Sequence, residues 1–569
     1  MFARIFVVLL SAMQFIPSTD CFLSLRSSGF TRLSPRKICM TNTIESRPQP
    51  QPSSNLQPWS ADSRDTNEAR YISAARSTVD LLVHGDLSNL LQHYSRSSGA
   101  VHKTRLCNRE FYLISDPRLV REICVEQSSV FRNREEHRGC PMTAVGLTVA
   151  EDDVWEQYRS ILNPSFFKRD RIQEHCEMLV PMTMTMIEDL KERRKAVDLT
   201  SYCVALSQSI LLNILFSEEI FSWRQVRENL PPKNPIFKLT EHAMAWTELV
   251  KRQVKMVLFG DGVFEFIKAF TNRKGQLKFL RARSRQSIRD FRVVKTLTSL
   301  SFWILKKLSA GKQQRGHGEV PFLPIVQKRR NELREGKQPP DDVLTRLIAA
   351  EVPRGEKGKG GEEERSPSLS DEEICLILRD IMTAGVGSTG EVISSTVWEI
   401  IRDRQVRELV EAELDLVLGS RQIPRYQDLM QLTYLTSCVK EVLRKNAFAS
   451  LVFRLASSDT TLSRSSSSSS LEVKKGSVMI MSPQVLGQDE NSWYNPHEFR
   501  PERFSSSPAG DVRPEEPADA FSFIPFGAGP RYCLGAQTAM AEVVLITAAM
   551  LRNAKITAQE GGEEAGGDV

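Results

Sequence analysis

The sequence predicts a mainly α-helical protein with a few short strands, and three observations lead to this fold class. Residues 172–350 follow a mostly helical spacing of apolar residues, and residues 370–402 form a second long helical run. A third apolar helix is predicted from Ala536 to Leu551. Strand-like alternation is brief by comparison and centres on residues 100–115.

Composition indicates one large globular unit. The chain has 569 residues, and its 41% hydrophobic content is enough to bury a single large core. The net charge of +6 is small for this length and is spread along the chain, so we expect no nucleic-acid partner. The ten cysteines show no Cys-x-x-Cys pair and no disulfide framework. Cys203, Cys375 and Cys438 fall within apolar helical patterns, where buried free thiols are expected.

The N-terminal region has the composition of a targeting sequence. Residues 1–21 hold one basic residue and a short apolar run, typical of a secretory signal and too short to span a bilayer; a membrane anchor is the alternative. Residues 22–67 lack acidic residues as far as Glu45, are rich in Ser and Arg, and end in a proline-rich linker. Together they resemble a bipartite presequence that leads to a plastid by the secretory route, with the endoplasmic reticulum membrane as the alternative destination.

The folded part is predicted to begin near residue 68, with a helix over residues 68–82. Residues 100–115 are predicted to form a β-hairpin. Asp116 is the predicted N-cap of the next helix and Pro117 its first residue. From residue 556 onward we expect a disordered tail, residues 556–569.

One cysteine lies in a glycine-rich loop directly before the C-terminal helix, in the run Phe526-Gly-Ala-Gly-Pro-Arg-Tyr-Cys533-Leu-Gly535. The free N–H groups and positive dipole of the helix N-terminus favour a thiolate at Cys533 over a thiol. The glycines remove side chains where the backbone passes close to a flat cofactor. Arg531 is placed to face an anionic group of that cofactor.

This loop resembles the Phe-x-x-Gly-x-Arg-x-Cys-x-Gly signature of the cytochrome P-450 family at every defined position: Phe526, Gly529, Arg531, Cys533 and Gly535. The resemblance implies that these residues bind haem b, iron protoporphyrin IX. It also implies that the Cys533 thiolate is the protein ligand of the metal and that Arg531 faces a haem propionate.

Other landmarks of that family follow in the same order along the chain. Glu441 and Arg444 form an i, i+3 pair on one face of a helix predicted from Tyr434 to Lys445. Arg503 stands in a Pro-Glu-Arg-Phe segment, and the resemblance implies that it joins this pair in a buried structural triad. The resemblance also implies contact with the haem propionates for Trp155, Arg159 and Arg454.

The helix over residues 370–402 is predicted to begin at a capping box formed by Ser370 and Glu373. Its centre contains three glycines, each of which costs about 1 kcal/mol relative to alanine in a helix. We attribute these glycines to a cofactor pressed against the helix.

The same helix resembles the family's oxygen-activating pattern, Ala/Gly-Gly-x-acid-Thr-Thr. Ala384 and Gly385 match it, and the resemblance places them against the haem. Ser388 and Thr389 occupy the positions of the catalytic hydroxyls, and Ser388 can both donate and accept hydrogen bonds. The acid position holds Gly387 instead of a carboxylate.

This chain departs from the family pattern in several ways. Loss of the acid at Gly387 removes a group whose help is typically worth 10²–10⁴-fold in rate. Glu391 could replace it through water, and the alternative is that Glu391 is an ordinary polar helix residue. No Pro-Pro run follows Arg444, and Ser463 to Ser470 is a serine tract expected to be a flexible surface insertion. The segment after Cys533 is short for the family's closing strands.

For residues 68–555 the resemblance implies one mainly helical domain with a small β-rich lobe and a haem between two long helices. The leading function is a monooxygenase that inserts one atom of O₂ into a small apolar substrate, either a carotenoid or another lipid-like molecule. Electrons would come from ferredoxin or a flavoprotein reductase, and peripheral membrane contact is expected. Plastid carotenoid-ring hydroxylases are the subfamily that residues 114–117 and 428–435 most resemble.

Two alternatives from other classes remain open. A haem-thiolate isomerase or dehydratase that rearranges a lipid hydroperoxide needs neither the acid nor a reductase, so Gly387 favours it, whereas the ordinary spacing around Cys533 counts against it. A degenerate haem-binding protein without turnover would explain the lost acid, the serine tract and the short C-terminal segment.

Overall fold

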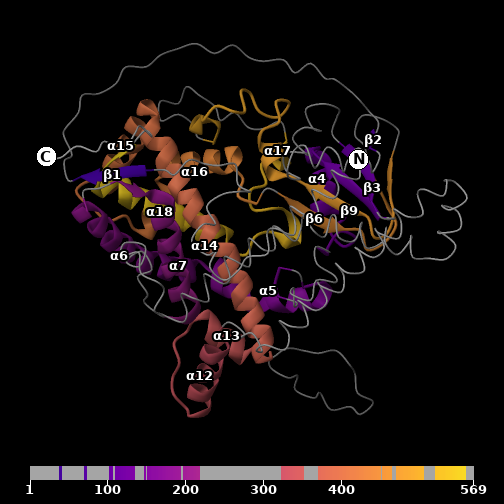
Figure 1. Ribbon diagram of the computed structural model, residues 1–569, viewed down its shortest axis with the longest axis horizontal. Coiled ribbons are helices and arrows are strands. Elements are labelled where there is room, and N and C mark those ends of the chain that lie inside the picture. The colour runs from indigo at the N-terminus through magenta and orange to yellow at the C-terminus, as the bar shows by residue number, and fades with distance from the viewer. Residues whose placement is uncertain are drawn as a thin grey trace, which may run out of the picture.

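The computed structural model describes residues 37–41, 70–72, 101–106, 109–134, 146–148, 150–193, 196–217, 322–350, 369–449, 451–463, 470–504 and 519–558. Within these ranges the protein is mainly helical, with a three-stranded sheet on one side of the helices and a five-stranded sheet on the other (Figure 1). The predicted fold class is confirmed.

The longest helix, α14 (Asp371–Arg402), crosses the middle of the fold (Figure 1). It begins at the predicted capping box, in which the Ser370 side chain accepts from the Glu373 N–H and the Glu373 carboxylate accepts from the Ser370 N–H. The main helices packed against α14 are α7 (Leu199–Phe216), α15 (Arg404–Leu418), α16 (Thr433–Lys445) and α18 (Ala536–Asn553).

Two further long helices complete the core. Helix α5 (Asp152–Phe167) leads into α6 (Arg169–Arg193), and both pack against α18. Cys203, Cys375 and Cys438 are buried free thiols in α7, α14 and α16, as predicted. The shorter described helices are α4 (Pro117–Arg121), α12 (Leu323–Arg334), α13 (Val343–Ala349), α17 (Pro483–Gly487), η2 (Glu122–Glu126), η3 (Tyr426–Met430), η4 (Pro501–Phe504), η5 (Ala520–Ser522) and η6 (Gly529–Arg531).

Helix α4 starts as its sequence predicts. The Asp116 side chain accepts a hydrogen bond from the Arg118 N–H at 2.9 Å, and Pro117 occupies the first turn, where its missing N–H costs nothing. Helix α7 passes a length and hydropathy test for a membrane span and is the only described helix to do so. Its residues are mostly buried against α14 and its other neighbours, which is the environment of a core helix.

The larger sheet contains the predicted hairpin. Its strand order is β2-β3-β4-β9-β6, where β2 is Arg70–Ile72, β3 is Val101–Leu106, β4 is Arg109–Ile114, β9 is Val478–Met481 and β6 is Val452–Leu455. β3 and β4 pair antiparallel, as predicted for residues 100–115. The predicted helix over residues 68–82 is wrong at 70–72, because β2 pairs in parallel with β3. Pairing with a neighbouring strand outweighs local propensity there, and residues 73–82 lie outside the described ranges.

The smaller sheet corrects the predicted start of the disordered tail and includes part of the predicted leader. Its order is β10-β1-β5, formed by β1 (Lys37–Thr41), β5 (Val197–Asp198) and β10 (Lys555–Ala558). β1 lies within the predicted transit-peptide-like segment, 22–67, and β10 runs into the predicted tail, 556–569. Both segments look unstructured by composition, yet each supplies a strand because distant partners satisfy its backbone. The rest of both segments lies outside the described ranges.

A short hairpin flanks the serine tract. Strand β7 (Thr460–Leu462) pairs antiparallel with β8 (Leu471–Val473), so the tract lies between two paired strands. Residues 464–469 lie outside the described ranges, and the flexible insertion there stays a prediction.

Candidate functional site

The cysteine loop is shaped by tight backbone geometry. The Cys533 N–H donates to the Phe526 carbonyl at 3.0 Å, which closes the loop before α18 begins. Gly527 and Gly529 have φ of 74° and 68°, a left-handed conformation that other residues rarely adopt. A Cβ on Gly529 would come within 1.8 Å of the Cys124 carbonyl oxygen in η2. Glycine at 529 is therefore required by the backbone of η2.

The Cys533 side chain is exposed, although the residues around it, Arg531 and Leu534, are buried. Surrounding protein raises the pKa of the Cys533 thiol, while a hydrogen bond from the Gly535 N–H and the charges of Arg134 and Arg159 lower it. The predicted backbone hydrogen bond and nearby cations are thus present, and they oppose the desolvation that the surrounding protein imposes on the thiol. A bound metal ion would favour the deprotonated form of a coordinating thiol further.

Arg531 is held by backbone carbonyls and an aromatic ring. Its side chain donates to the Arg132 carbonyl at 3.0 Å and to the Ala150 carbonyl at 2.7 Å. The guanidinium carbon lies 4.2 Å from the centroid of the Trp155 ring, a cation–π contact. Burial and the nearby charges of other arginines lower the pKa of Arg531 to about 9. This buried cation lies in a field of like charge, which an anionic ligand would relieve.

The like charges come from an arginine cluster, which we define as Arg132, Arg134, Arg454 and Arg531. Arg454 is buried in β6 and donates to the Ala528 carbonyl at 3.3 Å. Arg134 Nε is buried and has no hydrogen-bond partner within the described residues. Because a buried N–H without a partner is costly, it marks a place for an acceptor such as a carboxylate. Sequence reasoning missed Arg132 and Arg134, since no spacing pattern distinguished them from other surface arginines.

The structure also brings Trp155 and Arg159 of α5 to the cysteine loop. Trp155 is buried, and the Arg159 guanidinium lies 5.9 Å from its ring centroid and 5.5 Å from that of Phe167. Burial lowers the pKa of Arg159, and the nearby Cys533 raises it. The charge of Arg159 therefore acts on Cys533 as well as on the region of the arginine cluster.

Helix α14 presents an open face between its buried sides. Ala384 is exposed, and Ser388, one turn later, donates from its hydroxyl to the Ala384 carbonyl at 2.6 Å. A Cβ on Gly387 would meet only the Phe448 ring, at 3.9 Å, which is ordinary contact. Thr389 is buried one turn after Gly385, on the side of α14 that faces α7. Its burial on that side gives no support to a catalytic role for Thr389.

Two of the three glycines of α14 lie against α7. A Cβ on Gly390 would lie 2.5 Å from the Val204 backbone, so Gly390 allows the two helices to pack closely, a cause that the predicted cofactor contact did not include. A Cβ on Gly385 would lie 2.9 Å from the end of the flexible Leu211 side chain, and the place of Gly385 against the haem stays a prediction. Only Gly387 of the three lies on the open face.

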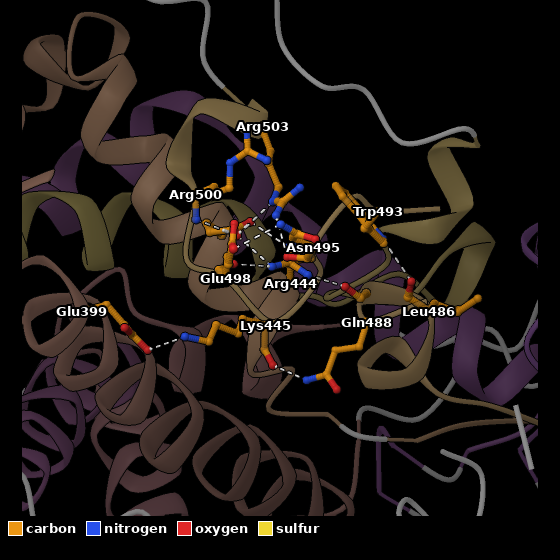
Figure 2. Close-up of polar contacts among 12 residues, drawn as sticks. Glu399, Arg444, Lys445, Leu486, Gln488, Trp493, Asn495, Glu498, Arg500 and Arg503 are labelled. Atoms are coloured by element: carbon orange, nitrogen blue, oxygen red, sulfur yellow. Dashed lines mark hydrogen bonds and ion pairs between the residues drawn. The ribbon is translucent and has the colours of Figure 1, made fainter. Parts of the chain in front are cut away.

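The predicted triad is assembled and fully buried (Figure 2). Arg444 holds the Glu441 carboxylate with two hydrogen bonds of 2.7 Å, and Arg503 Nε donates to it at 3.3 Å. Backbone carbonyls accept the spare donors: Glu498 at 3.2 Å from Arg444 and Asn495 at 2.9 Å from Arg503. Figure 2 shows the Arg444 and Arg503 side chains close to Asn495 and Glu498. The triad thus anchors residues 487–503 to α16.

These features fit a haem. An exposed thiol lies on a glycine-rich loop, and a buried guanidinium N–H of the arginine cluster has no partner in the part of the chain that the structure describes. A partly exposed strip of α14 ends at a hydroxyl. Cys533 would hold the iron, and Arg134, Arg531 and Arg454, with Trp155 and Arg159 beside them, would hold the propionates. Phe526, Gly529 and Gly535 shape the loop that carries the ligand.

Comparison with known proteins agrees with this assignment. A family model described as "Cytochrome P450" matches residues 77–565. Cytochrome P450 3A5 of Homo sapiens is 24% identical over 446 residues, covering 77% of this chain and 75% of the relative. Cytochrome P450 3A6 of Oryctolagus cuniculus is 23% identical over 447 residues, covering 78% and 76%. Cytochrome P450 3A16 of Mus musculus is 21% identical over 451 residues, covering 78% and 76%.

Proposed function

The chain belongs to the cytochrome P450 family and is a haem-thiolate monooxygenase that binds haem b and acts with O₂ and a redox partner, and we propose that its substrate is a small apolar, lipid-like molecule. The proposal rests on the open face of α14. Between Ala384 and Ser388 this face carries a methyl group, a glycine and one hydroxyl, with the Phe448 ring beside Gly387. Such a surface favours apolar contact and a single polar interaction.

When bound, the haem supplies an iron centre on which electron donation from a thiolate ligand favours O–O cleavage. The chain contributes the Cys533 sulfur, held in place by the Gly535 N–H and the loop-closing bond to Phe526. Arg134, Arg454 and Arg531 provide positive charge for the propionates. Ser388 can hold a proton at its Oγ and pass it on, since a hydroxyl both donates and accepts.

The proton path of this chain has a gap at Gly387. The family's acid is absent, so we propose that Ser388 works with water or with Glu391, which lies one turn further along α14. Phe448 packs at Gly387, where the carboxylate would begin. General acid catalysis typically contributes 10²–10⁴-fold in rate, and part of this contribution would be lost. We therefore expect either slow turnover or the consumption of much O₂ without formation of product.

The central experiment separates ligand binding from turnover. Protein lacking only residues 1–21 is purified, reduced and treated with carbon monoxide, with Cys533→Ala as the control. A long-wavelength Soret band that the control lacks is expected from thiolate ligation. Carotenoids, fatty acids and sterols are then supplied with and without a reductant, and product that needs both O₂ and reductant supports the proposal. Turnover of polar substrates alone would overturn it.

The isomerase or dehydratase alternative is favoured by Gly387 alone. Such an enzyme would convert a lipid hydroperoxide without reductant, and restoring the acid would not improve it. Gly387→Asp separates the two functions, and its Cβ has room. We expect more product per O₂ consumed, with Gly387→Asn as the uncharged control. No gain, together with hydroperoxide conversion by the parent protein in the absence of reductant, would favour the alternative.

The leader directs the protein to a compartment, and the compartment determines which electron donor is available. Its composition supports delivery to a plastid by the secretory route, where ferredoxin would serve, and the carotenoid substrate class belongs to that proposal. Retention in the endoplasmic reticulum membrane, with a flavoprotein reductase, is the other destination. Imaging the full chain with a C-terminal fluorescent tag distinguishes them, and a reticular pattern would overturn the plastid assignment.

A further inference from the structure

Strand β1 (Lys37–Thr41) is the central strand of the smaller sheet, although its partners are far away in the sequence. On one side it pairs antiparallel with β10, with Ile38 opposite Ala558 and Thr41 opposite Lys555. On its other side it pairs with β5 at Lys37 and Ile38. Figure 1 shows β1 among α6, α15 and α18, on the side of the fold opposite the larger sheet.

The two partner strands are fixed to the helical core independently of each other. Val197 in β5 and Ile556 in β10 are buried, and the Asp198 side chain caps α7 by accepting from the Thr200 N–H. Arg407 of α15 donates to the Ile556 carbonyl at 3.3 Å. Because neighbouring strands lie about 4.8 Å apart, β5 and β10 are about 9–10 Å apart and cannot pair with each other. Without β1, both would lose backbone partners beside buried side chains.

We propose that residues 37–41 are an integral strand of the mature protein and that proteolytic removal of the N-terminal leader therefore ends before Lys37. Composition assigns this stretch to a segment that import would discard, whereas the sheet assigns it to the fold. A cut after Thr41 would remove the middle of the sheet, and a cut before Lys37 leaves the sheet whole. The strand order therefore limits the processing site on physical grounds.

The pairing is tested first in the full chain by a cross-link. The register places Cys39 opposite Thr557, so Thr557→Cys puts two cysteines at opposed positions. Mild oxidation should give a disulfide between residues 39 and 557, identified by mass spectrometry of the joined peptides. Ile556→Cys is the matched control, since successive strand positions face opposite sides of a sheet. No cross-link in the first variant, or an equal yield in the second, overturns the pairing.

The contribution of the strand is tested at Ile38, which has a strand on each side. Its N–H must point toward one of these strands, so Ile38→Pro removes a ladder hydrogen bond whichever strand that is. The midpoint of thermal unfolding should fall in Ile38→Pro and stay close to the parent value in Ile38→Val. Equal midpoints in all three proteins would contradict an integral strand.

The processing limit itself is tested with the full-length precursor. It is imported into isolated plastids and, in parallel, into endoplasmic reticulum microsomes, and the N-terminus of the haem-loaded product is mapped by mass spectrometry. We expect a mature chain that begins at Lys37 or earlier in whichever compartment processes it. A stable haem-loaded chain that begins after Thr41 would overturn the proposal, whatever its catalytic activity.

Discussion

Gly529 lies against the backbone of Cys124, so that a Cβ on Gly529 would approach the Cys124 carbonyl oxygen to 1.8 Å. Cys124 belongs to η2, far upstream in the chain, and Gly529 begins η6, which carries Arg531. The backbone of η2 therefore supports the loop that carries both Arg531 and Cys533. The residue proposed to bind an anion and the residue proposed to bind the metal share this support.

Alanine substitutions at Gly529 and Gly527 form a matched pair. Both positions have positive φ, but a Cβ on Gly527 meets nothing within 4 Å. Gly527→Ala should cost about 1–2 kcal/mol through backbone strain alone. Gly529→Ala adds overpacking, worth about a further 1–3 kcal/mol or more. Haem content and urea unfolding measure the difference, and equal losses in both variants would contradict the contact with Cys124.

Alanine substitutions at two glycines of α14 should change the free energy of unfolding in opposite directions, because only one of the glycines contacts α7. Gly390→Ala would press against the Val204 backbone at 2.5 Å and should destabilise the protein by about 1–3 kcal/mol or more. Gly387→Ala meets only Phe448 at 3.9 Å and should stabilise α14 by about 1 kcal/mol through helix propensity. The free energies of unfolding of the two variants should move in opposite directions, and a shift of the same sign would be inconsistent with this packing.

The Glu441 carboxylate is the anion that neutralises two buried arginines. Glu441→Gln leaves Arg444 and Arg503 buried with excess charge and should lower the free energy of unfolding by about 3–5 kcal/mol. The partly exposed pair of Glu399 in α14 and Lys445 in α16, 3.2 Å apart, is the control, and Glu399→Gln should cost about 1 kcal/mol or less. Denaturant titration compares them, and similar costs would show that burial of the triad contributes little.

Glu542 of α18 predicts a pH dependence of stability. Burial raises the pKa of its carboxyl from 4.5 to about 8, so it is protonated at neutral pH in the folded protein. The unfolded chain releases this proton near pH 4.5. Since the folded state then binds more protons, the stability contributed by Glu542 is full below pH 4.5 and is lost as pH rises to about 8.

Glu542→Gln keeps the shape of the neutral side chain and removes this titration. Between pH 5 and 8 its free energy of unfolding should fall less steeply than that of the parent, by a total on the order of a few kcal/mol. Glu188→Gln, at an exposed position on α6, is the charge-matched control and should follow the parent curve. Parallel curves for Glu542→Gln and the parent would mean that Glu542 is already ionised in the fold.

Much of the site could be predicted because it depends on local spacing. The order of Phe526, Gly529, Arg531, Cys533 and Gly535 is set by one tight loop, and the capping box of Ser370 and Glu373 is set by one helical turn. Within the triad, Glu441 and Arg444 lie one turn apart on α16, so this pair follows from spacing. In these cases the neighbours in sequence are also the neighbours in space. Arg503 is 62 residues from Glu441, and its place in the triad was predicted from the resemblance and is confirmed.

Contacts between distant segments were not predictable in the same way. The role of Gly390 depends on its contact with the backbone of α7, and that of Arg134 depends on the other cations near Arg531.

The family, the mainly helical class, the cysteine loop and the missing acid at Gly387 could be predicted from the sequence, because each is expressed in residue types at short, fixed spacing. Three features emerge from the tertiary structure alone: the protein around Cys533 raises the pKa of its thiol, Gly390 allows two helices to pack closely, and residues 37–41 complete a sheet with residues 555–558. These depend on desolvation, steric contact and strand pairing between segments far apart in the chain, and no local pattern records such partners.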